Sequence, residues 1–463
     1  MHPCYSLRGR ARGLGSEGSG LPAACMKISI ISINRERIPD PLLPVGPAIV
    51  AASLRAEGHE VHILDLCHQK EAGSAIVSHL TAWQPHLVGI SLRLLENNQM
   101  IGHRSYLEEA KRVVEQVKKV SSCPIVLGGV AYSLFPGEVL EFLDAPYGLA
   151  GEAEHSVAAL VRCIETGQPP SGVPGACYRA GRRVVVNGLA KVHNFGGLTS
   201  PAYDLVDCRK YVDENAVLPI ESKRGCDLAC SFCPESVDRE GARLKPATLT
   251  VDEIEQLTRQ VGTNRLFFTD GVFHHPSEHA MALCREMIRR QLDVRWLAGV
   301  NPVGLSRKML EAMREAGCVG VALGLDAATD GMLKSYNKGF TEADIVRTLA
   351  DLRAVGIPFA IYMLFGGPGE TLDSVRRSLD FLDAQAPDKT VFIGMGIRVF
   401  KGTALERTAR REGFIEPGQN MLLPIYYLSR PLDESLLDRL EEYCQTHPGW
   451  FTTASLMASL PRR

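Results

Sequence analysis

The stretch KRGCDLACSFCP, residues 223–234, places Cys226, Cys230 and Cys233 at a CxxxCxxC spacing between a glycine and a proline. Three thiolates in so compact a loop can hold one corner of an iron–sulfur cube, which ordinarily takes four cysteine ligands. One iron then keeps an open position, and an open metal position is where a substrate or a second cofactor binds. The spacing therefore predicts a 4Fe–4S cluster with one free site.

Two other interpretations of this motif are open from the residues alone. A structural zinc site needs a second Cys or His pair at a similar spacing, and the next cysteines, Cys284 and Cys318, stand singly in apolar segments. A redox dithiol would use Cys230 and Cys233 but leave Cys226 without a role. The cluster accounts for all three cysteines.

The motif, with the aromatic Phe232 before its last cysteine, resembles the signature of the radical S-adenosylmethionine (SAM) enzymes. This resemblance implies that the open iron binds SAM, and that one electron from the cluster cleaves SAM to a 5′-deoxyadenosyl radical. A reductant such as flavodoxin or ferredoxin is then expected as a partner.

Residues 216–420 alternate strand and helix patterns in six units, which predicts a partial (β/α)6 TIM-like barrel with its site at the carboxyl ends of the strands. Polar and glycine motifs stand at these ends. Helix caps, turn glycines and solvated lysines are the structural alternatives for them. By the resemblance, the residues that contact SAM are Phe232, Asp270, Gly271, Asp326, Lys338 (or Lys334), Gly366 and Gly367.

Residues 26–165 alternate buried strands with amphipathic helices, which predicts a doubly wound, Rossmann- or flavodoxin-like parallel sheet. Glycines follow several strand ends, where a ligand can approach the backbone. Together these features resemble the cobalamin-binding domain found ahead of many radical SAM cores. By that resemblance the cobalamin contacts are Pro41, Leu43, Pro44, Gly46, Ser91, Leu92, Arg93, Gly128, Gly129, Gly151, Glu152 and Glu154.

The histidine that ligates cobalt in classical cobalamin domains has no counterpart after the first expected strand, where residues 34–40 read NRERIPD. His68 follows the second strand at the wrong spacing and is expected to be a surface histidine. The loop 91–97 is the alternative neighbour of the lower face of cobalt. Arg93 is its candidate residue, with a solvated or Glu96-paired arginine as the structural alternative.

The remaining segments carry less information. Residues 1–25 are rich in Gly, Ser and Arg and read as a disordered leader, in which the GxGxxG match at 13–18 has no flanking strand. Residues 166–215 read as a linker with a small hairpin, and residues 421–463 as a C-terminal helical cap. His274, His275 and His279 could form a second metal site, although adjacent histidines rarely point at one ion.

Composition bounds the function class. The 463 residues carry a net charge of −2, which gives no electrostatic footprint for nucleic acid, and no apolar run approaches the ~18 residues of a membrane span. Thirteen cysteines, mostly scattered singly, indicate a reducing cytoplasm rather than a disulfide framework.

These expectations combine into a cobalamin-dependent radical SAM methyltransferase, which the resemblance implies takes a methyl group from methylcobalamin to an unactivated carbon or a phosphorus of a small molecule or peptide. Its catalytic residues are unknown, with Tyr362 and Arg398 as candidates and a structural ion pair as the alternative for Arg398. A radical cyclisation, ring contraction or oxidation with the same cofactors is the second hypothesis, and a non-catalytic cobalamin or iron–sulfur sensor is the third.

Overall fold

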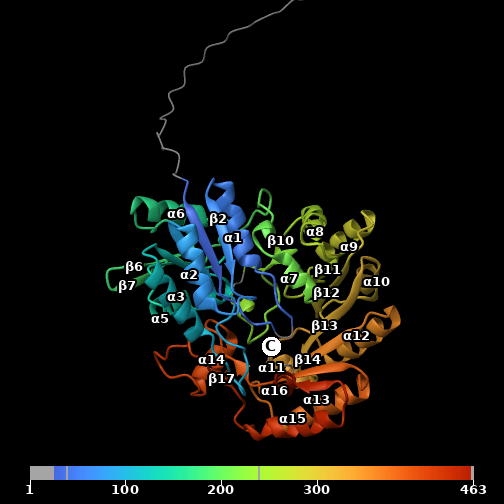
Figure 1. The fold of residues 1–463 in the computed structure, drawn as a ribbon. Coiled ribbons are helices and arrows are strands. Elements are labelled where there is room, and N and C mark those ends of the chain that lie inside the picture. The colour runs from blue at the N-terminus through green and yellow to red at the C-terminus, as the bar shows by residue number, and fades with distance from the viewer. Residues whose placement is uncertain (1–24, 38–39, 238–239, 460–463) are drawn as a thin grey trace, which may run out of the picture.

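The computed structural model describes residues 25–37, 40–237 and 240–459. Most of the expected leader, with the GxGxxG match at 13–18, lies outside the described residues. Two seven-stranded sheets organise the rest of the chain, one in the N-terminal part and one in the C-terminal part (Figure 1). No helix in the described part of the chain has the length and apolar character that a bilayer crossing requires.

The first sheet has the strand order β2-β1-β3-β4-β5-β6-β7 and is parallel from β2 to β5. The order 2-1-3-4-5 is that of a flavodoxin-like, doubly wound sheet, which confirms the expected fold class. Its strands are β1 (Lys27–Ser32), β2 (Glu60–Asp65), β3 (Leu87–Ser91), β4 (Ile125–Gly128), β5 (Tyr147–Leu149), β6 (Ala176–Ala180) and β7 (Arg183–Val186). Its helices are α1 (Val45–Ala56), α2 (Ala72–Trp83), α3 (Leu107–Val120), α4 (Val130–Leu134), α5 (Pro136–Phe142) and α6 (Val157–Thr166).

The expected hairpin of the linker forms as β6 and β7, which pair antiparallel to each other. β6 also pairs antiparallel to β5. The hairpin therefore extends the first sheet, so that this part of the segment 166–215 belongs structurally to the N-terminal domain. The 3-10 helix η1 (Tyr203–Leu205) and α7 (Cys208–Asp213) follow it and lead to the second sheet.

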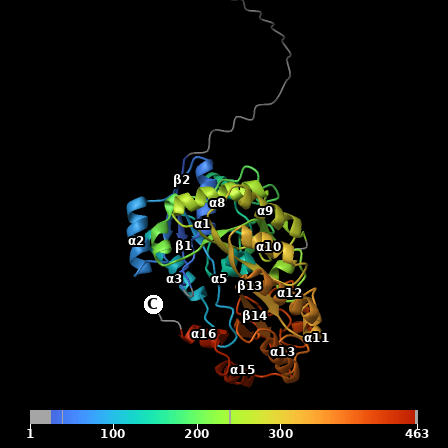
Figure 2. The ribbon, with the colours of Figure 1, turned by 90° about the vertical axis from the view of Figure 1, so that its right-hand side faces the viewer.

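The second sheet has the order β8-β11-β12-β13-β14-β15-β18, and all its strands are parallel. Sequential parallel order is typical of an open barrel, and α8, α9, α10, α12 and α13 follow one another along its outer side (Figure 2). The strands are β8 (Leu218–Ile220), β11 (Arg265–Phe268), β12 (Arg295–Val300), β13 (Cys318–Asp326), β14 (Phe359–Phe365), β15 (Thr390–Met395) and β18 (Trp450–Thr452). The helices are α8 (Ala247–Val261), α9 (Ser277–Arg289), α10 (Arg307–Glu315), α11 (Asp330–Ser335), α12 (Glu342–Val355) and α13 (Leu372–Gln385).

The C-terminal part of the barrel differs from the expectation. β18 adds a seventh strand, whereas the sequence predicts only a helical cap over residues 421–463. β15 ends at Met395, and Gly396 after it adopts a left-handed φ of 75°. The remaining elements are the 3-10 helix η2 (Pro234–Ser236), β9 (Lys223–Arg224), β10 (Arg243–Leu244), β16 (Ile397–Arg398), β17 (Tyr426–Tyr427), α14 (Ala404–Arg411), α15 (Ser435–Gln445) and α16 (Thr453–Ser459).

Helix formation follows the apolar spacing and the capping residues. In α3, buried residues at helical spacing (Leu107, Ala110, Val114 and Val117) form one face, with charged residues on the other. In α12, Thr341 and Asp344 form a capping box, and Gly356 ends the helix in a left-handed conformation. Side-chain caps also begin α10 at Ser306 and α13 at Thr371, and they fix which residues remain in the loops before these helices.

Candidate active site between the two sheets

The cysteine loop leaves the second sheet through β8 and β9, and its base is held by a buried polar network. Asp270, which follows β11, accepts hydrogen bonds from the Ser222 backbone N at 2.9 Å and from the Ser222 Oγ at 2.5 Å. Burial raises the pKa of the Asp270 carboxyl, although these hydrogen bonds oppose the shift. Lys223 Nζ donates to the carbonyls of Val272 (2.5 Å), Phe273 (3.1 Å) and His275. The loops after β8 and β11 therefore form one unit.

The three cysteine side chains are half-buried in the loop after Gly225, whose φ is +80°. A Cβ atom at Gly225 would lie 2.7 Å from the carbonyl oxygen of Gly241, so only glycine fits this turn. Burial raises the pKa of all three thiols, that of Cys233 to about 11. Thiolates in this loop need the positive charge of a metal group to stabilise them, and an iron–sulfur cluster supplies it.

The thiols do not converge on a single ion. Across residues 25–37, 40–237 and 240–459, no group of three or more His, Cys, Asp or Glu side chains is placed to hold one metal ion. The histidines considered for a second metal site point elsewhere: His274 Nε2 lies 2.8 Å from the Val303 carbonyl, and His279 Nε2 lies 3.1 Å from the Ser222 carbonyl. His275 approaches Asp227 at 3.9 Å.

Three of the residues assigned to SAM meet beside the cysteine loop. Lys338 is 5% exposed, and its Nζ donates to Asp326 Oδ2 at 2.5 Å. The same ammonium lies 6.0 Å from the ring centroid of Phe232. Burial opposes the charge of Lys338, but the Asp326 carboxylate holds its pKa above the ordinary value. The alternative lysine, Lys334, is exposed on α11.

Gly366 and Gly367 end β14, and both have close protein neighbours. A Cβ atom at Gly367 would lie 1.8 Å from Tyr336 Cε1, and one at Gly366 would lie 2.8 Å from a Leu428 methyl. From the sequence these glycines are expected to contact SAM, whereas in the structure Tyr336 and Leu428 occupy the space that side chains would need. Contact of these backbone segments with SAM remains a proposal.

A buried carboxyl, Glu370, holds this turn. Its Oε2 accepts the backbone N–H groups of Gly366 and Gly367 and lies 3.3 Å from the Tyr336 hydroxyl. Glu370 Oε1 has no hydrogen-bond partner among the described residues, and burial raises the pKa of the carboxyl to about 7. Tyr336 in turn contacts the cysteine loop, because its carbonyl accepts the Ser231 N–H at 2.9 Å and its ring meets Phe232 edge-on.

A cavity of about 560 Å³ lies between the two sheets. Its deep end is apolar and is lined by residues of β1, β3, β4, α1 and α6, among them Ile28, Val50 and Leu160. Its other end is lined by the barrel residues Arg224 and Gly271, next to the cysteine loop. The cavity therefore runs from the interior of the first domain to the base of the cysteine loop.

Seven of the twelve residues assigned to cobalamin line this cavity. Those that line it are Gly46, Ser91, Gly128, Gly129, Gly151, Glu152 and Glu154, and of the SAM set Asp270 and Gly271. Pro41, Leu43 and Pro44 are buried before α1, and Leu92 is buried after β3. Gly129 has a φ of +103°, and a Cβ atom there would lie 2.4 Å from the Leu92 carbonyl oxygen, which explains the glycine. An apolar floor with glycines at its rim fits a bulky corrinoid.

Arg93 and His68 lie apart from this cavity. Arg93 lines a small pocket with Glu36 and Tyr106, and burial lowers the pKa of its guanidinium. His68 packs edge-on against Tyr211, and its Nε2 lies 3.3 Å from a Glu214 oxygen, with 11% of the side chain exposed. Because most of its side chain is buried against Tyr211 and Glu214, the expectation that His68 is a surface histidine is wrong.

The two candidate catalytic residues have different surroundings. Arg398 is buried and pairs with Glu96, and it also donates to the carbonyls of Val399 (2.8 Å) and Met421 (3.0 Å). Arg398 therefore forms the structural ion pair that was the alternative to a catalytic role for this residue. Tyr362 is 43% exposed, and its ring packs at a tilt against Phe392 with a centroid distance of 5.0 Å. A contact of Tyr362 with substrate stays a prediction.

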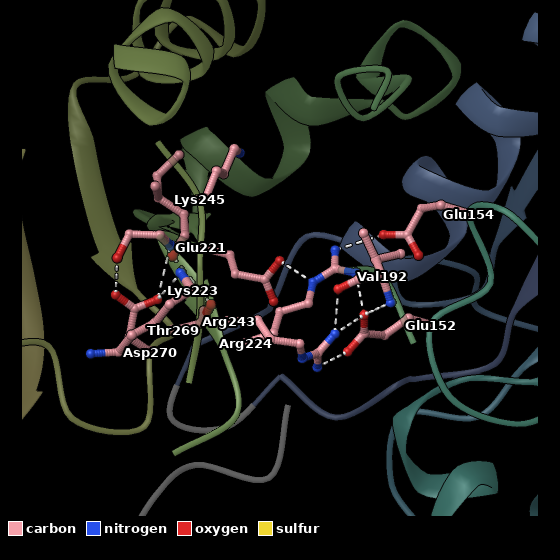
Figure 3. A network of polar contacts seen from close by, with 12 residues as sticks. Glu152, Glu154, Val192, Glu221, Lys223, Arg224, Arg243, Lys245, Thr269 and Asp270 are labelled. Carbon is pink, nitrogen blue, oxygen red and sulfur yellow. Dashed lines mark hydrogen bonds and ion pairs between the residues drawn. The ribbon is translucent and has the colours of Figure 1, made fainter. Parts of the chain in front are cut away.

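Two arginines at the domain boundary are not among the site residues expected from the sequence. Arg224 donates to Glu152 and Glu154, and Arg243 donates to Glu152 from the neighbouring strand (Figure 3). Arg224 stands directly before Gly225 in the cysteine stretch, which is a signal of its place. Arg243 lies in a two-residue strand that no periodic pattern identifies.

Known proteins share both parts of this arrangement. The model of the Radical SAM superfamily matches residues 220–382, and that of the B12 binding domain matches residues 31–161. A tryptophan 2-C-methyltransferase of Streptomyces laurentii is 26% identical over 454 residues, with 84% of this chain and 76% of that protein covered. An uncharacterized methyltransferase of Pyrococcus horikoshii is 24% identical over 345 residues, with coverages of 73% and 72%.

One solved structure has the same fold over nearly the whole chain. It is that of the radical S-adenosylmethionine methyltransferase TsrM of Kitasatospora setae with cobalamin and a 4Fe–4S cluster bound. The TM-score is 0.78 at 22% identity, and the match covers 95% of this chain and 90% of that one. The similarity includes both domains and their order.

Proposed function

Because the chain belongs to the radical SAM superfamily and carries a B12-binding domain, we propose that it is a cobalamin-dependent methyltransferase acting on a small molecule or peptide. The observation that carries this proposal is the single cavity of about 560 Å³ shared by the two domains. A corrinoid at the edge of the first sheet and a cluster at the edge of the second would then face the same cavity. A shared cavity matters because bound cofactors and substrate that fill it keep water away from reactive species.

The described residues fit both cofactors. Cys226, Cys230 and Cys233 are the proposed cluster ligands, and the apolar floor around Val50 and Leu160 is the proposed seat of the corrinoid's nucleotide base. When bound, the cofactors supply a cobalt centre that carries a methyl group and an iron site that holds SAM and reduces it. The protein's own task is to hold these groups and exclude water.

The residues beside the cysteine loop suit the recognition of SAM. The Lys338 ammonium offers a buried positive charge for a carboxylate, and its pairing with Asp326 fixes its position. Phe232 adds an aromatic face at the same place. We assign SAM to the space that these side chains adjoin, next to the cysteine loop.

The names of the relatives support a class of substrate, an organic molecule, but no single compound. The Streptomyces protein is named for tryptophan, and for this chain we propose an organic substrate with an unactivated carbon. The proposal includes a one-electron reductant, such as flavodoxin or ferredoxin. It also includes a cytoplasmic location, because the twelve cysteines in the described ranges are free thiols and the cluster requires reducing conditions.

The test is anaerobic reconstitution of the full chain with iron, sulfide and hydroxocobalamin, followed by incubation with a chemical one-electron reductant, tryptophan as the probe substrate, and SAM that carries a trideuterated methyl group. We expect an iron–sulfur absorption band, a bound corrinoid, and a product that gains the mass of one trideuteromethyl group in place of hydrogen. A product that gains no carbon would support cyclisation or oxidation instead. A protein that binds both cofactors but consumes no SAM would indicate a sensor and would reject the proposal.

A further inference from the structure

Arg224 joins the two domains at the base of the cysteine loop. It is the last residue of β9, two positions before Cys226, and only 11% of its side chain is exposed. Its guanidinium donates to Glu221 at 2.7 Å, to Glu152 at 3.1 Å and to Glu154 at 2.6 Å. Two of these three carboxylates belong to the loop after β5 in the first domain. One side chain therefore ties the cysteine loop to the other sheet.

Arg243 makes a second tie from the same ribbon. It lies opposite Arg224 in the antiparallel pair of β9 and β10, and it holds both oxygens of Glu152, at 2.8 and 2.5 Å. Two arginines in such a cross-strand position repel each other unless an anion lies between them. Glu152 is that anion, because its carboxylate contacts both guanidinium groups (Figure 3).

The β9–β10 ribbon also supports the cysteine loop directly. Asp227, the residue after Cys226, accepts the backbone N–H of Ala242 at 2.8 Å. Gly225 begins the loop against the Gly241 carbonyl. A shift of the ribbon relative to the first domain would therefore move the backbone of Cys226.

We propose that Glu152, Glu154, Arg224 and Arg243 form an interdomain clamp that positions the cluster-binding loop against the rim of the B12-binding sheet. The inference rests on the proposed function and revises one part of it. From the sequence Glu152 and Glu154 are expected to contact cobalamin. In the structure their carboxylates accept hydrogen bonds from the two arginines, and that of Glu152 also from the Val192 N–H at 2.7 Å. Both glutamates line the cavity as members of ion pairs. Arg224, which contacts both of them, is the residue that positions the cysteine loop.

The ionisation of Glu152 agrees with this role. Burial opposes its negative charge, but the hydrogen bonds from Arg243 and Val192 and the charge of Arg224 leave its pKa below the ordinary value. The carboxylate is therefore charged at neutral pH, as the clamp requires. The Glu152→Gln substitution keeps the shape of the side chain and removes that charge.

The test compares Glu152→Gln with the wild type after reconstitution with iron, sulfide and hydroxocobalamin and reduction to the paramagnetic cluster and cob(II)alamin. We expect unchanged iron and corrinoid contents but a broadened or lengthened cluster–cobalt distance in pulsed dipolar EPR. The matched control is Glu286→Gln, because Glu286 also bridges two arginines, Arg289 and Arg290, but on the surface helix α9. Loss of corrinoid from Glu152→Gln with the distance unchanged in the loaded fraction would overturn the clamp and restore the cofactor-contact role.

A conservative substitution separates positioning from simple loss of stability. Arg243→Gln should broaden the distance distribution, and Arg243→Lys should broaden it less, because lysine keeps a positive charge that can pair with Glu152. Equal broadening in the two variants would overturn the inference, provided that both bind iron as the wild type does.

A measurement without cofactors separates this inference from the proposed function. Hydrogen exchange of the unloaded wild type and of Glu152→Gln measures how strongly the contact of Glu152 with the two arginines protects the nearby backbone amides. We expect amides near residues 151–154 and 223–227 to exchange about tenfold faster in the variant, with α9 unchanged. If the protein binds no corrinoid, the proposed function fails while this readout still tests the clamp. Equal exchange in the two proteins would reject it.

Discussion

Glu96 of the first domain and Arg398 of the barrel, 302 positions apart in the sequence, form an ion pair in which 7% and 4% of the two side chains are exposed. The same carboxylate lies 3.1 Å from His103 Nε2 and accepts the Tyr426 hydroxyl at 3.0 Å. This contact joins the loop after β3 to β16 and β17. It is a second connection between the domains, made by other elements than Arg224 uses.

The first prediction concerns this pair. Glu96→Gln leaves the Arg398 guanidinium buried without a counter-charge, so we expect the free energy of unfolding to fall by about 3 kcal/mol. Denaturant unfolding of the unloaded protein measures it. Replacing both residues, with Glu96→Leu and Arg398→Met, should cost less than the single change. If Glu96→Gln unfolds like the wild type, the pair does not stabilise the domain contact.

The second prediction tests whether the cluster site in the barrel can be lost while the corrinoid site is kept. Cys230→Ala removes one proposed cluster ligand, so we expect loss of bound iron and of SAM cleavage, with the corrinoid spectrum retained. Cys444→Ala is the control, because Cys444 is also half-buried but lies on α15. Reductive SAM cleavage by Cys230→Ala would show that the ligand assignment is wrong.

The third prediction is the converse experiment on the first domain. Val50 is half-buried on α1 and lines the cavity, so Val50→Trp should fill part of the space and abolish corrinoid binding while iron is retained. Val77→Trp on the exposed side of α2 is the control and should bind corrinoid normally. The measurement is corrinoid absorbance per iron after gel filtration. Equal corrinoid in both variants would place that cofactor outside this cavity.

The fourth prediction distinguishes the two lysines near the cysteine loop. Lys338→Met removes the buried charge next to Phe232, and we expect SAM affinity to fall by about tenfold or more, in line with a lost charged hydrogen bond. Lys334→Met changes an exposed lysine on α11 and should leave the affinity unchanged. Equilibrium dialysis with the iron-loaded protein measures both. The reverse order of effects would transfer the role to Lys334.

The fifth prediction is a pH dependence. Burial raises the pKa of Glu370 from 4.5 to about 7, so between these values the folded protein binds a proton that the unfolded chain has released. The contribution to stability is therefore full below about pH 4.5 and is lost as the pH rises to 7, by on the order of 3 kcal/mol. Glu370→Gln should remove this difference. The readout is the wild-type minus variant free energy of unfolding from pH 4.5 to 8, and a flat profile would contradict the assignment.

The parts of the fold that follow regular patterns were predictable. The alternation of buried strands and amphipathic helices predicted β1 to β5 and six of the barrel strands, because each such strand is apolar and each helix has one apolar face. β18 was missed, since Trp450 and Thr452 bound a three-residue strand that only its pairing with β15 defines.

The candidate site was predictable where a motif is local. Cys226, Cys230 and Cys233 lie within one short loop, so their spacing alone indicates that they bind one metal group together. Arg243 and Tyr336 could not be found this way, because their roles depend on residues far along the chain: Glu152 for the first and Gly367 for the second. Ionic and steric partners that lie far apart along the chain leave no periodic trace in a sequence.

The close approach of Tyr336 and Gly367 constrains how this protein can diverge. Any side chain at position 367 would enter the volume of the phenol ring, so the two positions can change only together, the smaller residue on one side permitting the larger on the other. Among relatives that keep this turn, an aromatic residue at 336 should always accompany glycine at 367, and a substituted 367 should accompany a small residue at 336.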